Sequence, residues 1–275
     1  MADINTYEEK IRLEYDTLEL QTLLSDVHDE GDVILTINAG AGGTDAQDWA
    51  DMLLRMYVRW VEKKGFSYQI IDISEGEEAG IKSVTLEVRG EYAYGLMKSE
   101  HGIHRLVRLS PFNANNKRQT SFASVDVIPL IEQSTDVEIN SDDIRIDTFR
   151  SSGAGGQHIN KTDSAVRITH LPSGIVVQCQ NQRSQIQNKE VAMRALLSKL
   201  VVLKELENAN ALNGIAESNK EISWGNQIRS YVFHPYTMVK DHRTRHEVGQ
   251  VADVMDGAFD GFIQAYLHFK RESLT

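Results

Sequence analysis

The sequence predicts an α+β protein with more than one domain. Its 275 residues are enough for about two domains of ordinary size. Segments with alternating apolar residues, typical of half-buried strands, are interspersed with long amphipathic segments typical of helices. A smaller set of the same elements, with its own glycine-rich loop, interrupts the pattern between about residues 139 and 222. We therefore expect an inserted α+β domain there.

The first unit is expected to cover residues 31–138, after an amphipathic helix at 6–24 and an acidic linker. The glycines of the turn 40–43 need unusual backbone angles, and a helix follows to about Lys64. Thr44 and Gln47 have the spacing of a capping box at its start. The expected strands of this unit are 33–38, 68–73, 84–88, 103–109 and 120–131, the last two forming a hairpin.

The inserted unit and the chain end follow the same logic. For the insertion we expect strands at 144–148, 165–170 and 175–180 and a helix from about 188 to 208. A strand at 228–233 and one amphipathic helix at 251–269 close the chain. These last two elements are too few for a core of their own, so we expect residues 223–275 to pack back on the first unit.

Composition excludes several classes of protein. The globular balance of 41% hydrophobic and 25% charged residues excludes wholesale disorder, and no apolar run is long enough to span a bilayer. The single cysteine, Cys179, allows no internal disulfide, and the first residues do not resemble a signal peptide, so a cytoplasmic protein is expected. The net charge of −11 conceals two basic segments, 98–125 and 150–199, suited to contact phosphate.

The most unusual segment is the loop from Arg150 to Lys161, which has three glycines within four residues and no acidic residue. Its bare amide N–H groups are potential donors to an anion or to a developing oxyanion. From composition alone, a flexible hairpin tip explains it equally well. The spacing matches neither the dinucleotide-binding pattern nor a Walker-type phosphate loop.

A second unusual segment is the hairpin tip Ser110–Asn113, where proline fixes the backbone and Phe112 offers a ring for stacking. A polar loop with a buried Phe is the plainer interpretation.

The histidine pairs 101/104 and 234/242 lack the further ligands of a metal site, so we expect hydrogen-bonded or solvated histidines and no metal. Cys179 has no evident base and is expected to be a packed thiol.

Taken together, the two loops resemble those of bacterial class I peptide chain release factors, which end translation. Gly155-Gly156-Gln157 matches the family's hydrolysis motif, and Ser110-Pro111-Phe112 matches the tripeptide of the type that reads UAA and UGA. Residues 42–49 and 223–231 match further family blocks, so the resemblance covers about residues 30–270. The family carries a sizeable helical domain before this region, of which residues 1–30 resemble a remnant.

The resemblance implies that residues 31–138 read the stop codon. Unpaired N–H groups at the helix start near Gly42 would meet the first uracil, and Asp45 would accept from its N–H. Ser110 would read the second base, Thr120 the third, and Phe112 would shape the pocket beside Pro111. At Gln119 the family often has a stacking His, which Gln replaces here.

The resemblance also implies that residues 139–222 act on the ester of peptidyl-tRNA, in the peptidyl transferase centre of the 70S ribosome. The Gln157 N–H would stabilise developing charge while Gly155 and Gly156 keep the loop free of side chains. Gln157 would also be N5-methylated by a dedicated glutamine methyltransferase. Trp224 would lie in the switch segment. Neither a cofactor nor a membrane partner is implied, and hydrolysis would occur only within the ribosome, not by a free enzyme.

One alternative keeps the same chemistry without codon reading. A ribosome rescue factor would retain Gly155-Gly156-Gln157 but need no intact tip at 110–112, and such proteins tend to end in a basic tail. The end of this chain, residues 270–275, is not a long basic tail.

Overall fold

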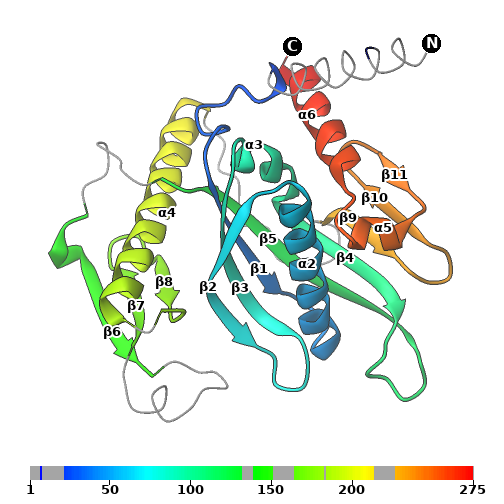
Figure 1. Ribbon diagram of the computed structural model, residues 1–275, viewed down its shortest axis with the longest axis horizontal. Helices are drawn as coiled ribbons and strands as arrows, with labels where there is room; N and C mark the ends of the chain where they lie inside the picture. The colour runs from blue at the N-terminus through cyan, green and yellow to red at the C-terminus, as the bar shows by residue number, and fades with distance from the viewer. Residues whose placement is uncertain are drawn as a thin grey trace.

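The computed structural model of the protein describes residue 7 and residues 22–131, 139–150, 164–182, 184–213 and 227–274. Figure 1 shows a large sheet crossed by α2 (Thr44–Lys63), with a smaller sheet and α4 (Gln185–Asn213) to one side. The large sheet has eight strands in the order β11-β10-β9-β4-β5-β1-β3-β2, and the small sheet has the order β6-β7-β8. A mixed α+β fold is thus confirmed. The helix expected at 6–24 lies almost entirely outside the described residues.

Every predicted strand is present, within a few residues of its expected bounds. In the large sheet they are β1 (Val33–Ala39), β2 (Ser67–Glu75), β3 (Ile81–Arg89), β4 (Gly102–Leu109), β5 (Arg118–Pro129) and β9 (Gln227–Val232). The structure adds two short strands and three short helices that were not predicted: β10 (Met238–Asp241), β11 (Glu247–Val248), α3 (Ala93–Met97) and the 3₁₀ turns Lys98–Glu100 and Ser141–Asp143.

Helix α2 covers the large sheet with its apolar face. Trp49, Leu53 and Trp60 are fully buried there, and the chain leaves the helix through Gly65, whose φ of 72° favours glycine. The predicted capping box is wrong. The helix begins at Thr44 with Gly43 as its cap, and the Thr44 hydroxyl instead donates to Glu78, 3.0 Å away, so it caps no backbone N–H.

The predicted single helix at 251–269 is also wrong, because two helices occupy this segment: α5 (Val251–Met255) and α6 (Asp260–Leu274). Gly257 lies between them with a φ of 89°, which ends α5. A Cβ at this position would lie 2.7 Å from the backbone nitrogen of Trp60. The break therefore lets the chain approach α2 closely and turns Phe259 into the core, where it stacks on Trp60.

The terminal segment joins the large sheet through β9, which pairs with β4 in parallel. Arg229 of β9 is fully buried and donates to both carboxylate oxygens of Glu100, at 2.6 and 2.7 Å. Burial alone would raise the pKa of Glu100, but Arg229 holds it below its ordinary value. This ion pair ties β9 to the turn before β4. The domain limits at residues 138 and 222 stay a prediction.

The small sheet packs around a second hydrophobic core, which it shares with the large sheet. It consists of β6 (Ile144–Phe149), β7 (Ala165–His170) and β8 (Val176–Cys179), and α4 covers one face. Buried Ile168 and Leu196 belong to this core, which also includes Ile34 and Ile71 of the large sheet. The Gln180 side chain donates to the carbonyl of Ile73 on the edge strand β2 at 3.0 Å. The two sheets are therefore in direct contact.

Candidate nucleic-acid interface

Two turns far apart in the sequence meet at one end of the large sheet. The turn 40–43 before α2 is fixed to β5 by two backbone hydrogen bonds: Gly40 N–H donates to Phe122 at 2.8 Å, and Phe122 N–H donates to Ala41 at 3.0 Å. The β4–β5 hairpin then brings its tip, residues 110–117, to the same place. The start of α2, the tip and the start of β5 thus form one continuous surface.

Gly42 is required by this close approach. Its φ of 138° disfavours any other residue. A Cβ here would lie 3.1 Å from both the Ser121 hydroxyl and the Ala46 side chain. The predicted site residue Gly42 therefore lets the helix start lie directly against β5.

Asp45 and Ser110, predicted to read adjacent bases, are in direct contact. The Ser110 hydroxyl donates to one Asp45 carboxylate oxygen at 2.7 Å. The same hydroxyl accepts from the backbone N–H of Phe112 at 3.2 Å. Ser110 is only 1% exposed, whereas Pro111 and Phe112 beside it are exposed. The structure thus brings together the two residues that the family resemblance assigns to the first and second bases.

Arg108, which is not among the predicted site residues, completes the cluster. Its guanidinium donates to Asp45 at 3.3 Å and to Asp48 at 2.5 Å, and the side chain is largely buried. The sequence does contain a cation two residues before the tip and two carboxylates at the start of the predicted helix, a combination that could have suggested an ion pair between them. Because Arg108 neutralises both carboxylates, the surface can contact RNA although its helix start is acidic.

The remaining tip residues offer groups to a ligand. Phe112 is 45% exposed, which contradicts the plainer interpretation of a buried Phe. Gln119 is exposed and Thr120 half-buried, opposite Arg108 and Val107 across the hairpin. The other predicted site residues, Gly155, Gly156, Gln157 and Trp224, lie outside the described residues.

Comparison with known proteins agrees with this arrangement. Residues 1–125 match the PCRF domain and residues 132–243 match the RF-1 domain. The chain is 61% identical over 255 residues to peptide chain release factor 2 of Clostridium perfringens, covering 93% of this chain and 70% of the relative. It is 59% identical over 257 residues to peptide chain release factor 2 of Thermosipho melanesiensis, with coverage of 94% and 70%.

The chain belongs to the peptide chain release factor 2 family. It is also similar in structure to RF2 of Thermus thermophilus, with a TM-score of 0.86 and 46% identity, over 98% of this chain and 76% of that one. Translation termination is therefore the function of this release factor, as its sequence predicts.

As expected, the histidines of the two pairs are hydrogen-bonded or exposed to solvent, and the cysteine of this release factor is a packed thiol. His104 is buried, with its Nε2 2.9 Å from the Glu100 carbonyl and its Nδ1 3.3 Å from the Tyr231 hydroxyl. Cys179 is buried against Asn188, and burial raises the pKa of its thiol. Within the part of the chain that the structure describes, no group of acidic, His or Cys side chains could hold a metal ion.

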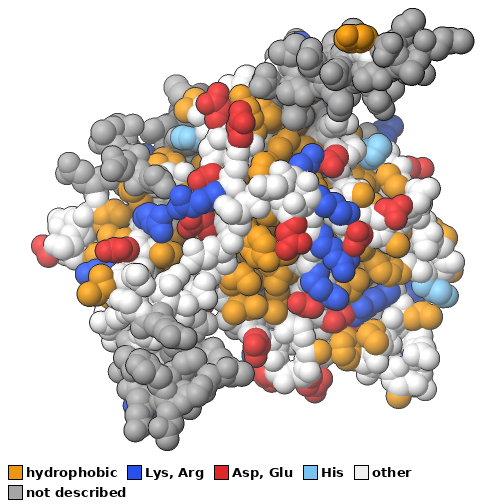
Figure 2. All heavy atoms as spheres, viewed as in Figure 1, with side chains coloured by type: hydrophobic (Ala, Val, Ile, Leu, Met, Phe, Trp, Pro, Cys, Tyr) orange, Lys and Arg blue, Asp and Glu red, His pale blue; other side chains and the backbone are white. Residues whose placement is uncertain are grey.

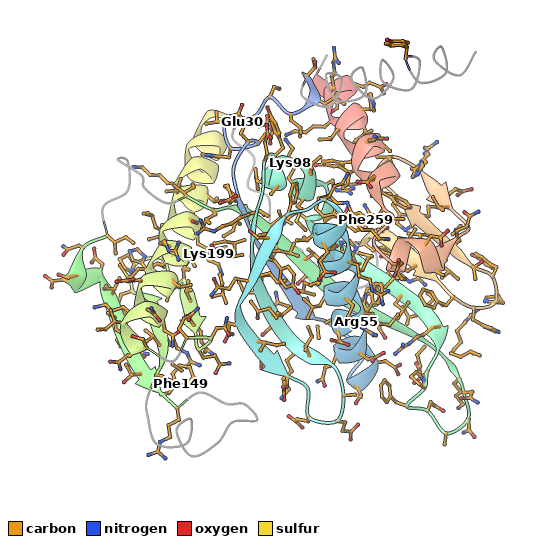
Figure 3. All side chains as sticks on the ribbon, viewed as in Figure 1. Glu30, Arg55, Lys98, Phe149, Lys199 and Phe259 are labelled. Carbon is orange, nitrogen blue, oxygen red and sulfur yellow. The ribbon has the colours of Figure 1, made fainter. Side chains whose placement is uncertain are left out.

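The outer face of α2 carries both signs of charge. Figure 2 shows basic side chains interspersed with acidic ones on this face of the molecule. Arg55 points away from the helix (Figure 3) and pairs with Asp51, and Arg59 pairs with Asp256 at 2.6 Å. These cations of the release factor are already neutralised, whereas Lys117 and Arg118 of the β4–β5 hairpin are exposed and have no ion-pair partner among the residues that the structure describes.

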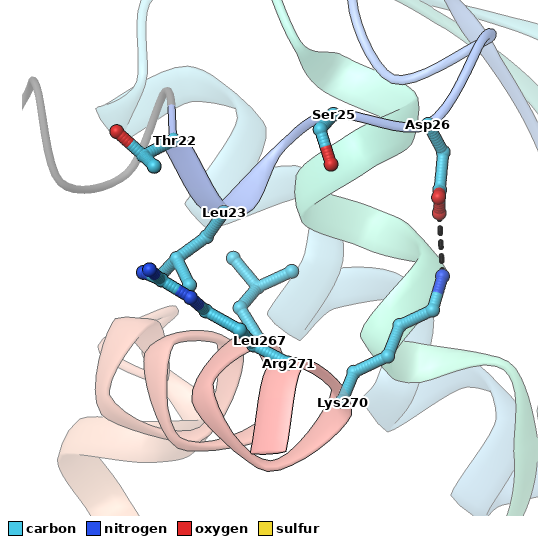
Figure 4. Close-up of a pocket in the computed structure, with 7 residues that line it drawn as sticks. All are labelled: Thr22, Leu23, Ser25, Asp26, Leu267, Lys270 and Arg271. Atoms are coloured by element: carbon cyan, nitrogen blue, oxygen red, sulfur yellow. Dashed lines mark hydrogen bonds and ion pairs between the residues drawn. The ribbon is translucent and has the colours of Figure 1, made fainter. Parts of the chain in front are cut away.

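A shallow pocket lies where residues 22–26 cross α6 (Figure 4). Its lining combines apolar Leu23 and Leu267 with the ion pair between Asp26 and Lys270. Hydrogen bonds from Lys270 and Lys98 lower the pKa of Asp26 to about 2. The pocket therefore marks where residues 22–26 attach to α6.

No described helix of the release factor is long and apolar enough to cross a membrane.

Proposed function

We propose that this release factor recognises UGA and UAA in the ribosomal A site and triggers hydrolysis of the peptidyl-tRNA ester. The observation that carries the proposal is the contact between Ser110 and Asp45, which joins the tip to the start of α2. It makes one surface of residues that would otherwise face the codon separately. Residues 31–138 and 223–275 would form the codon-reading part, and residues 139–222 the hydrolytic part.

The cluster suggests how one hydroxyl accepts both adenine and guanine as the second base. A serine hydroxyl has one donor and two acceptor sites. In the free protein, the Ser110 hydroxyl donates its hydrogen to Asp45 and accepts, on one lone pair, from the backbone N–H of Phe112. The second lone pair can accept from the adenine N6 amino group. Guanine O6 is an acceptor, so the Ser110 hydroxyl would have to donate its hydrogen to guanine and no longer to Asp45. Since Ser110 is buried, base contact requires the tip to rearrange.

Asp45 would retain room for the first base. A carboxylate has about four acceptor positions, and Ser110 and Arg108 use one on each oxygen. The N–H of uracil can occupy another. Cytosine has no N–H at this ring position, so it would leave the carboxylate without a donor and be rejected. The Arg108 contact holds the Asp45 carboxylate in one orientation.

Hydrolysis would depend on the loop at Gly155–Gln157, with water as the nucleophile and the Gln157 N–H stabilising developing charge. Because that loop sequence has no carboxylate base, proton transfer would involve ribose and ribosomal RNA, so the protein would promote hydrolysis only within the ribosome. Trp224 would lie in the segment that directs this loop to the ester after codon binding. Gln157 would be the substrate of a glutamine methyltransferase.

The test is peptide release from defined ribosomes. Formyl-Met-tRNA is placed in the P site, with UGA, UAA, UAG or a sense codon in the A site, and released formyl-Met is measured. We expect release on UGA and UAA only. Equal release on sense codons would contradict codon reading and would instead indicate a rescue factor.

A further inference from the structure

A second exposed turn lies beside the codon-reading tip. Strands β4 and β9 are parallel neighbours, with Val107 opposite Val232. The backbone N–H of Phe233, just after β9, donates to the carbonyl of Val107 at 2.8 Å. Because parallel neighbours end at the same edge of a sheet, the β9–β10 turn, residues 234–237, emerges next to the β4–β5 tip. Figure 1 shows both turns at the lower right of the large sheet.

This turn carries aromatic side chains in solvent. All four of its residues are exposed, and Tyr236 is 57% exposed. The adjacent tip exposes Phe112 and Leu109, which are 45% and 43% exposed. Large side chains are usually buried, so three of them in water at one edge of one sheet mark a surface that contacts something else.

The charge of this edge favours RNA. No acidic residue occurs from Ser110 to Val125 or from Arg229 to Lys240. Lys117 and Arg118 are exposed on the β4–β5 hairpin, and the carboxylates at the start of α2, Asp45 and Asp48, are held by Arg108. Exposed rings among cations and away from acids are the pattern by which proteins bind unpaired nucleotides, since rings stack on bases and cations meet phosphates.

We infer that residues 234–237 form a second RNA-binding element of this release factor, in which the Tyr236 ring stacks on an unpaired base beside the stop codon. The inference rests on the proposed function, because the neighbouring tip places RNA there. The β9–β10 turn supplies binding energy for the ribosomal complex and takes no part in hydrolysis.

The first experiment measures release on UGA ribosomes against protein concentration for Tyr236→Ala and Tyr236→Phe, with Tyr68→Ala as control. Tyr68 is 39% exposed on β2, the opposite edge strand of the sheet. Loss of one stacked base should raise the half-maximal concentration about 5-fold or more for Tyr236→Ala, at an unchanged maximal rate. Tyr236→Phe and Tyr68→Ala should match the wild type.

Two results would overturn the inference: a normal half-maximal concentration for Tyr236→Ala, or an equal rise for Tyr236→Phe. Absence of UGA-dependent release by the wild-type protein would instead contradict the proposed function, so the two failures are distinguishable. A photo-crosslinking residue at position 236 then identifies the partner. Crosslinks to messenger RNA or to ribosomal RNA support the inference and distinguish the two sources, whereas crosslinks only to ribosomal protein would refute it.

Discussion

The Ser110 hydroxyl lies 2.7 Å from a carboxylate oxygen of Asp45, although 65 residues separate the two in the chain. Asp45 is in the first turn of α2, and Ser110 follows β4 directly. The contact holds a helix start and a strand turn in one orientation before any ligand arrives. The two elements therefore lose less conformational entropy on binding, apart from the local shift of the tip that base contact would require.

The first prediction concerns Asp45. Asp45→Ala removes the acceptor from Ser110 and one partner from Arg108, so both the tip and the charge balance are disturbed. Hydrogen bonds to a charged group contribute about 1.5–3 kcal/mol, which corresponds to about 10-fold or more in the concentration for half-maximal release on UGA. Release against protein concentration measures it.

The matched control for this prediction is Asp51→Ala on the same helix. Within the described part of the chain, Asp51 pairs with the exposed side chain of Arg55 alone, at 3.4 Å, and surface pairs of this kind contribute little. We expect its release curve to match the wild type. An equal shift for both variants would show that the acidity of the helix, and not the contact with Ser110, controls release.

The second prediction concerns Gln157. If its backbone N–H stabilises the developing charge, Gln157→Pro, which has no N–H, should abolish peptide release by ribosomes to which the protein is bound. Gln157→Ala keeps the N–H and should retain part of the activity. Single-turnover release at saturating protein measures the difference, and equal losses in both variants would refute the role of the backbone donor.

The third prediction is a pH dependence of stability. Burial lowers the pKa of His104 to about 4, from an ordinary value of 6.5. The folded protein therefore keeps this ring neutral while the unfolded chain takes up a proton, so stability is complete above pH 6.5 and decreases as the pH falls towards 4. Between pH 7 and 5 this group should remove about 2 kcal/mol from the free energy of unfolding.

Urea unfolding of the wild type and of His104→Gln at several pH values tests this prediction. The variant should show a shallower decline, with His101→Gln, at an exposed histidine, as the control. His242, whose pKa is also lowered by burial, contributes equally in all three proteins. Parallel declines in His104→Gln and the wild type would contradict the assignment.

Sequence periodicity predicted the strands and α2 because their burial is dictated by their own residues. Short elements such as β10 and β11 were missed, since four and two residues carry too little pattern. The residues of the tip could be assigned from their match to a family. Arg108 could not be assigned in this way, because its importance arises from its contacts with Asp45 and Asp48 on another element. The unpredicted features are therefore of two kinds: elements too short to show a pattern, and contacts between distant segments.

The last prediction tests such a contact at Gly257. An Ala here would keep an unfavourable positive φ and place its Cβ 2.7 Å from the Trp60 backbone nitrogen, so α5 and α2 would have to move apart. The left-handed conformation alone costs about 1–2 kcal/mol. We expect Gly257→Ala to lower the free energy of unfolding by about 2 kcal/mol or more, measured by urea titration with tryptophan fluorescence.

Gly249→Ala is the matched control, because it lies just before α5 with no atom within 4 Å of the added Cβ. Its effect should stay within about 0.5 kcal/mol, as for ordinary surface substitutions. If the two variants unfolded at the same urea concentration, the close approach of Gly257 to Trp60 would not be what divides the terminal segment into two helices. A larger loss in Gly257→Ala would show that a helix break, invisible in the apolar periodicity, is set by the packing of α5 on α2.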